Sequence, residues 1–165
     1  MLNFRCTAIP TETAERFRAT RIDDRGGTAI VRELPAGSRG PCRHCLSFAR
    51  PGDTLLLLSY DLPRPRGVYW TPSPIFVHAD CCERFTSINE IPDIVRGTLV
   101  SLRSYDSQDM CLYDLGHVSE GTEIDEPLTR ALNDPRTAYV NIHTAKPGCF
   151  FCRVERIGVA SLRGA

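Results

Sequence analysis

The stretch DTLLLLSY at residues 53–60 contains the longest apolar run of the chain, the tetrad Leu55–Leu58. The turn-forming pair Pro51-Gly52 precedes this stretch, and Pro63 follows it closely. A short apolar run between such turn signals is typical of a strand that is covered on both faces. We therefore predict that residues 53–60 form a fully buried strand at the centre of the fold.

A second strand is predicted at residues 74–78, PIFVH, after an irregular proline-rich loop. Because side chains alternate along a strand, His78 should share a face with Phe76 and lie opposite Ile75 and Val77. His78 also ends this strand. A short turn after it can therefore present His78 together with the residues that follow.

Further strands are predicted where apolar residues lie between Asp-, Gly- or Pro-bearing turns, at residues 98–105, 110–118, 137–143 and 150–157. One clear helix is expected over residues 125–133, because acidic residues open it and Pro127 fits its first turn. A shorter N-terminal helix is expected over residues 11–19. The predicted fold class is α+β, with a mostly antiparallel sheet and the main helix packed on one face.

Length and composition predict one domain that spans residues 1–165. A chain of 165 residues with 42% hydrophobic content is long enough for one ordinary core and too short for two. The formal net charge is zero and the pI is about 6.9, so nucleic acid is not an expected partner. The longest apolar run has four residues and the N-terminus lacks an export signal, so we expect no membrane span and a cytoplasmic location.

Eight cysteines in a chain without an export signal suggest thiols rather than disulfides, because the cytoplasm is reducing. Cys42-Arg43-His44-Cys45 places two thiols two residues apart in a turn that Gly40-Pro41 opens. This spacing lets both sulfur atoms point at one tetrahedral metal ion, so the pair supplies half of a zinc site.

Two pairs of residues are candidates for the other half of the site. His78 ends a predicted strand and Cys82 lies four residues further on, so a short turn can bring both to one point. Cys149 and Cys152 offer a second pair with two-residue spacing, but it lies far along the chain from Cys42. We rank His78 and Cys82 first and predict the metal ligands to be Cys42, Cys45, His78 and Cys82, with zinc as the ion.

Other interpretations of the same residues stay open. Free cysteines are often buried as small apolar side chains. If the cysteines of this protein serve only as packing, the alternative hypothesis is a module that binds a small ligand or a protein partner through its arginines. Alternatively, Cys149 or Cys42 acts as a redox or nucleophilic thiol beside His143 or His78, although an exposed strand position for His143 is the more ordinary expectation. The sequence identifies no catalytic residue and no organic cofactor site.

Four phrases of the chain resemble the bacterial domain of unknown function 1203 family. They are PCRHCLSFARPGDTLLLLSYD at 41–61, PIFVHADCCERF at 74–85, LRSYD at 102–106 and KPGCFFCRVER at 146–156. The resemblance covers nearly the whole chain and includes the four predicted ligands and the pair Gly148-Cys149. It implies no activity, so the expected function is that of a small zinc-binding domain of unknown role.

Overall fold

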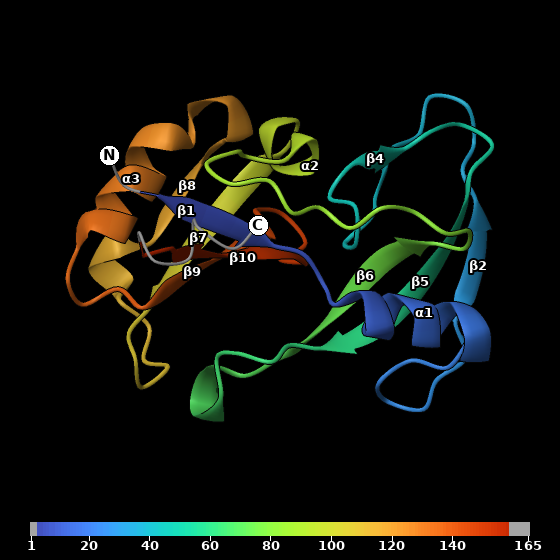
Figure 1. Cartoon of the computed structure of the whole chain (residues 1–165), viewed down its shortest axis with the longest axis horizontal. Coiled ribbons are helices and arrows are strands. Elements are labelled where there is room, and N and C mark those ends of the chain that lie inside the picture. Colours follow the sequence, from blue (N-terminus) through green and yellow to red (C-terminus); the bar gives the residue numbers. More distant parts are fainter. Residues whose placement is uncertain (1–2, 159–165) are drawn as a thin grey trace.

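The protein is described here by a computed structural model over residues 3–158, which forms an α+β fold built on two main antiparallel sheets (Figure 1). The larger sheet has the strand order β1 (Phe4–Thr7), β10 (Phe150–Arg156), β9 (Tyr139–Thr144), β7 (Leu99–Tyr105) and β8 (His117–Glu120). The smaller sheet has the order β2 (Ile30–Glu33), β5 (Thr54–Asp61) and β6 (Pro72–His78). A separate two-stranded hairpin consists of β3 (Gly40–Pro41) and β4 (Phe48–Ala49).

Three α-helices and three short 3-10 turns complete the fold over residues 3–158. The helices are α1 (Thr11–Thr20), α2 (Asp93–Arg96) and α3 (Asp125–Asn133), and the 3-10 turns are η1 (Gly67–Tyr69), η2 (Tyr113–Leu115) and η3 (Gly121–Glu123). Helix α1 lies beside the smaller sheet and α3 beside the larger one (Figure 1). Both predicted helices are thus confirmed, and α3 has the predicted bounds because its acidic first turn and Pro127 are strong start signals.

Strand β5 is the central strand of the smaller sheet, as the leucine run predicts. Leu56 and Leu58 pack into the core that α1 covers, and Leu55 is fully buried on the opposite face. Leu57 is only half-buried, so the strand is not covered along its whole second face. The hairpin sits directly on Leu55, because a Cβ atom at Gly40 would lie 2.2 Å from its Cδ1 atom.

Strand β6 pairs with β5 and shows the predicted alternation. Ile75 and Val77 are completely buried, whereas Phe76 and His78 on the other face are half-buried. His78 is the last residue of the strand and lies opposite Leu55. This register places His78 beside the hairpin that rests on Leu55.

The prediction of a strand over residues 110–118 is wrong. The Asp106 carboxylate accepts hydrogen bonds from the backbone N–H groups of Gln108 and Met110, which favours a local turn over a sheet ladder. Only a single bridge between Cys111 and Tyr105 pairs the first part of this segment with β7. The chain then forms η2, and the ladder with β7 begins at His117. Strands of four residues or fewer, such as β1, β2 and β3, carry too little periodicity to be predicted.

The predicted strands divide between two sheets, and the prediction of a single sheet is therefore wrong. The two sheets meet at Phe150, the first residue of β10. Its backbone N–H donates to Ser73 Oγ of β6, and its carbonyl accepts a hydrogen bond from Arg43 Nε. Because the Phe150 side chain lies in the core of the smaller sheet, this one residue connects both halves of the molecule. No helix within residues 3–158 is long and apolar enough to cross a membrane.

Candidate metal centre

The Cys-x-x-Cys segment forms a tight turn at the tip of the β3–β4 hairpin. The backbone N–H of Cys42 donates to the Ser47 carbonyl, and Leu46 takes a left-handed conformation that closes the turn. The backbone N–H of Arg43 donates to the carbonyl of Phe76 in β6. The turn is thereby held against the strand that ends in His78.

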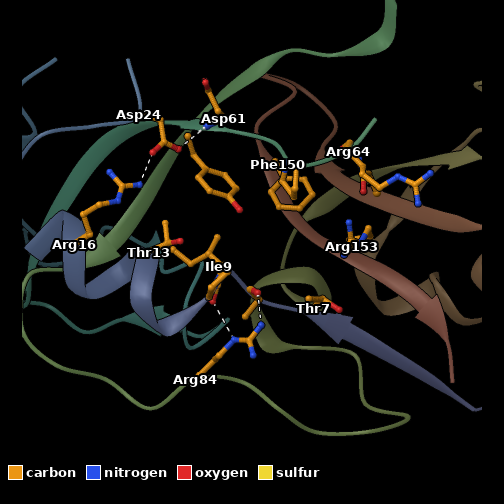
Figure 2. Close-up of a pocket in the computed structure, with 15 residues that line it drawn as sticks. Thr7, Ile9, Thr13, Arg16, Asp24, Asp61, Arg64, Arg84, Phe150 and Arg153 are labelled. Carbon is orange, nitrogen blue, oxygen red and sulfur yellow. Dashed lines mark hydrogen bonds and ion pairs between the residues drawn. The ribbon is translucent and has the colours of Figure 1, made fainter. Parts of the chain in front are cut away.

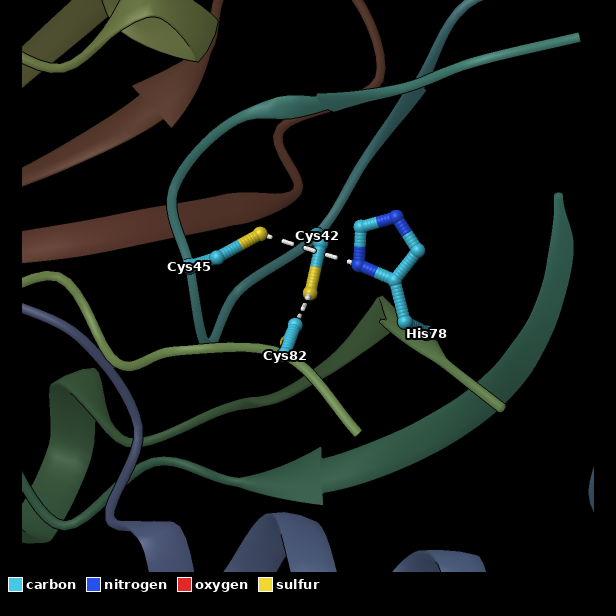
Figure 3. A group of neighbouring side chains, drawn as sticks. All are labelled: Cys42, Cys45, His78 and Cys82. Atoms are coloured by element: carbon cyan, nitrogen blue, oxygen red, sulfur yellow. Dashed lines mark hydrogen bonds between the residues drawn. The ribbon is translucent and has the colours of Figure 1, made fainter. Parts of the chain in front are cut away.

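The four predicted ligands come together from three places in the chain (Figure 3). Cys42 and Cys45 lie on the hairpin turn, His78 ends β6, and Cys82 lies on the segment that follows. The last contact of the β5–β6 pair is the hydrogen bond from the Ala79 N–H to the Thr54 carbonyl. The chain then turns back, which brings Cys82 next to the hairpin.

The distances between the ligand atoms match a tetrahedral metal site. All four ligand atoms lie within 4.8 Å of one another. The Sγ atoms of Cys42 and Cys82 are 3.9 Å apart, and Cys45 Sγ lies 3.6 Å from His78 Nδ1. Zinc–sulfur and zinc–nitrogen bonds at tetrahedral angles require separations of about 3.8 and 3.6 Å. The cluster, with Cys42 buried and the other three residues half-buried, could therefore hold a metal ion.

The second ring nitrogen of His78 faces a carboxylate. Its Nε2 atom lies 3.5 Å from Asp53 Oδ2, at the entrance to β5. This leaves Nδ1 free to face the thiols and Nε2–H free to donate to Asp53, an arrangement that metal-binding histidines commonly use. Sequence reasoning missed Asp53, because only the β5–β6 pairing brings the start of one strand next to the end of the other.

Two further side chains surround the sulfur of Cys82. A guanidinium nitrogen of Arg18 in α1 donates to Cys82 Sγ at 3.2 Å, and His44 Nδ1 lies 3.2 Å from the same atom. The other ring nitrogen of His44 lies 3.0 Å from the hydroxyl of Thr11, which opens α1. His44 sits inside the Cys-x-x-Cys segment and its role could have been suspected, but no sequence signal points to Arg18.

The proton equilibria of the four residues are strongly coupled. Hydrogen bonds from the thiols of Cys45 and Cys82 lower the pKa of Cys42, and the Cys42 thiolate raises the pKa of His78 to about 10. The pKa of Cys82 is raised because a hydrogen bond to Cys42 favours its protonated form. These shifts favour a thiolate at Cys42 beside a protonated His78, so a metal ion would displace protons in order to bind.

The alternative ligands Cys149 and Cys152 do not join this cluster within the described residues. Cys152 is completely buried in the core of the larger sheet, where its thiol contacts Cys6. Cys149 is half-buried in the turn that leads into β10. The sheet partition separates this pair from the hairpin, because Cys152 faces the other core.

His143 is buried and not at the surface, contrary to the more ordinary sequence expectation. Burial lowers its pKa to about 4, so the ring is neutral and its Nδ1–H donates to the Gly148 carbonyl at 2.9 Å. Among residues 3–158, no hydrogen bond joins His143 to Cys149. The geometry thus gives no support to a cysteine–histidine dyad at this position.

The comparisons with known proteins identify one family. Its model, described as "Protein of unknown function (DUF1203)", matches residues 40–156, a span that includes all four residues of the cluster. No curated protein and no solved structure matches the chain.

Proposed function

We propose that this chain, which belongs to the domain of unknown function 1203 family, is a small zinc-binding domain whose ion has a structural role. The observation that carries the proposal is the convergence of the ligand atoms of Cys42, Cys45, His78 and Cys82 to within 4.8 Å of one another. Sequence spacing and three-dimensional geometry independently favour the same four residues.

The chemistry of the donor atoms selects zinc. Three thiols and one imidazole are soft and borderline donors, whereas magnesium and calcium require oxygen ligands. No carboxylate belongs to the cluster itself, since Asp53 faces the far nitrogen of His78. Three thiolates and one neutral imidazole give a zinc site with a net charge of −1, and Arg18 places a positive charge next to Cys82.

A structural role follows from the number of protein ligands. Structural zinc sites are closed by four protein ligands, whereas catalytic sites keep a position for water or substrate. Here four protein ligands are available, and they come from the hairpin turn, the end of β6 and the segment after it. Zinc would therefore tie together three segments that backbone hydrogen bonds, such as Arg43 N–H to the Phe76 carbonyl and Phe85 N–H to the His44 carbonyl, already bring side by side.

Metal analysis of the purified protein tests this proposal. Protein prepared without added metal should contain close to one zinc per chain, and chelation should expose three additional reactive thiols. Because zinc binding stabilises the folded state only, the chelated protein should also melt at a lower temperature. Replacement of zinc by cobalt(II) should produce the visible absorption of a tetrahedral thiolate complex.

Matched cysteine variants provide the control. Cys45→Ser should lose stoichiometric zinc, whereas Cys111→Ser should retain it, because Cys111 is equally half-buried but lies outside the cluster. Metal-free protein with one unusually reactive thiol would favour a thiol-dependent enzyme instead. Metal-free protein with unreactive cysteines would mean that the thiols serve only as packing.

A further inference from the structure

A cavity of about 450 Å³ lies where the two sheets meet (Figure 2), and none of the four residues of the metal cluster lines it. Ile9 and Pro10 line one wall just before α1, and Tyr60 and Phe150 line another. Its volume is within the range of pockets that bind small molecules. These apolar walls favour a ligand with a flat or branched apolar body.

Four arginines line this cavity: Arg16, Arg64, Arg84 and Arg153. Three of them are paired with carboxylates, since Arg16 contacts Asp24, Arg64 contacts Asp109 and Arg153 contacts Glu155. Two carboxylates also line the cavity, and each has an arginine partner: Asp24 contacts Arg16, and Asp61 contacts Arg25. Arg84 has no carboxylate partner among residues 3–158.

Backbone carbonyls hold Arg84 in place. Its Nε atom donates to the Ile9 carbonyl at 3.0 Å, and one terminal nitrogen donates to the Ala8 carbonyl at 2.8 Å (Figure 2). A guanidinium carries five N–H donors, so several remain for a ligand. The charge of Arg84 is thus fixed at the cavity wall without a carboxylate to neutralise it.

The start of α1 adds to this positive potential. Pro10, which directly precedes α1, and Thr13 of its first turn line the cavity, and no side chain caps the first N–H groups of the helix. The N-terminus of a helix carries a partial positive charge that favours anions. The cavity therefore attracts a negative group from two independent directions, the helix and Arg84.

Asn141 on β9 lines the same cavity and supplies an acceptor that has no partner. The residue is fully buried, and its Nδ2 donates to the Arg64 carbonyl at 3.1 Å, which fixes the amide orientation. Its Oδ1 atom is buried without any hydrogen bond. A buried acceptor without a partner costs about 1–3 kcal/mol, so it calls for a donor from a ligand. The arginines disfavour a second cation, and therefore a hydroxyl is the better donor than an ammonium group.

We infer that this cavity binds a small hydroxylated organic acid with an aromatic or branched apolar body. The carboxylate binds at Arg84 and the start of α1, the apolar body packs on Phe150 and Tyr60, and the hydroxyl donates to Asn141 Oδ1. None of the four proposed zinc ligands lines this cavity, although Arg84 lies only two residues after Cys82.

Binding of matched probes to the full-length protein tests the inference. The probes are 4-hydroxyphenylacetate, phenylacetate without the hydroxyl, and the neutral 4-hydroxyphenylacetamide, with the same three forms built on benzoate and 3-phenylpropionate. Titration calorimetry and ligand-observed NMR measure the affinities. On at least one of the three scaffolds, the hydroxy acid should bind at least tenfold more tightly than its amide, and more tightly than the acid without the hydroxyl.

Three variants locate the site. Arg84→Gln should weaken binding of the hydroxy acid at least tenfold and leave binding of the amide nearly unchanged. Arg84→Lys should bind the hydroxy acid with an affinity between those of Arg84→Gln and the unaltered protein, because it keeps the positive charge but loses the planar guanidinium group. Arg130→Gln, an exposed arginine on α3, is the matched control and should bind normally. If Arg84→Gln does not fold, the acid–amide comparison on the unaltered protein decides alone. Equal affinities of acid and amide on every scaffold, or equal loss in Arg84→Gln and Arg130→Gln, overturns the inference.

Discussion

The Nε2 atom of His78 lies 3.5 Å from an oxygen of Asp53, so the last residue of β6 faces a carboxylate at the entrance to β5. This contact orients the imidazole with its other nitrogen toward the cysteines, 3.6 Å from Cys45 Sγ. Carboxylates in this position raise the basicity of a metal-binding histidine and lock its tautomer. Asp53 thereby becomes a positioning residue for the proposed zinc site.

Asp53→Asn should weaken zinc binding about tenfold, the lower end of the range for such partners, because the Asp53 side chain is 39% exposed. Competition with a zinc chelator of known affinity measures this change. Asp80→Asn is the matched control, since Asp80 is exposed in the nearby turn and outside the cluster. An equal effect of both variants would mean that only the general charge near the site matters.

Arg18→Gln should also weaken zinc binding, because the variant loses the charged hydrogen bond to Cys82 Sγ and leaves the negative site less compensated. Arg18 Nε also donates to the His78 carbonyl, so the variant removes two contacts at once. The loss should be larger at low salt than at high salt. Arg32→Gln, an exposed arginine on β2, should leave the affinity unchanged in the same assay.

Zinc affinity should rise with pH between about 6 and 8. The pKa of His78 is raised to about 10 in the metal-free cluster, and that of Cys82 is raised as well, so zinc displaces protons throughout this interval. Each displaced proton changes the affinity about tenfold per pH unit. Chelator competition at three pH values measures the slope. A slope near zero would show that the metal does not bind through these groups.

The stability of the metal-free protein should fall as the pH rises, whereas the zinc affinity should increase. A histidine pKa raised from 6.5 to about 10 stabilises the folded state fully below pH 6.5, and this contribution is lost as the pH rises through 10. The zinc-loaded protein should not show this loss of stability with rising pH. Bound zinc keeps His78 neutral at every pH in this range, so protonation of His78 contributes nothing to its stability. Thermal melting of both forms between pH 7 and 10 compares them directly.

Leu56→Ala should lower the free energy of unfolding by about 2–5 kcal/mol, because the Leu56 side chain is completely buried in the core beneath α1. Leu57→Ala on the other face should cost about 1 kcal/mol, since Leu57 is only half-buried. Urea denaturation measures both values. Equal losses of stability in the two variants would contradict the half-buried position of Leu57, because they would mean that this face of β5 is as well covered in solution as the face beneath α1.

The zinc-loaded chain should unfold in one cooperative transition, as expected for a single domain. Phe150 belongs to the larger sheet by its strand and to the smaller sheet by its side chain, so neither half keeps a complete core alone. Calorimetry tests this expectation.

Limited trypsin digestion should first cut after the exposed Arg66 in the loop between β5 and β6, two residues before Val68, which is 87% exposed. Two stable proteolytic halves would contradict the single domain.

The sequence by itself determined those features whose signals are local. The leucine run between turn signals specifies β5, and the acidic residues with Pro127 specify where α3 begins. The spacing of Cys42 and Cys45 indicates half of the candidate metal site, because two residues between thiols suit a tight turn. Period-two alternation correctly assigns the side of β6 on which His78 lies.

Only the tertiary structure decided which distant segments meet. The partition of the strands into two sheets buries Cys152 away from the hairpin, and it also buries His143. Asp53 approaches His78 through strand register, and Arg18 approaches Cys82 through the packing of α1. Such pairings depend on which surfaces bury the most apolar area together, a property of the whole chain. Local patterns therefore predicted most of the longer elements and the four candidate ligands, and long-range packing supplied the neighbours that set the chemistry of the candidate site.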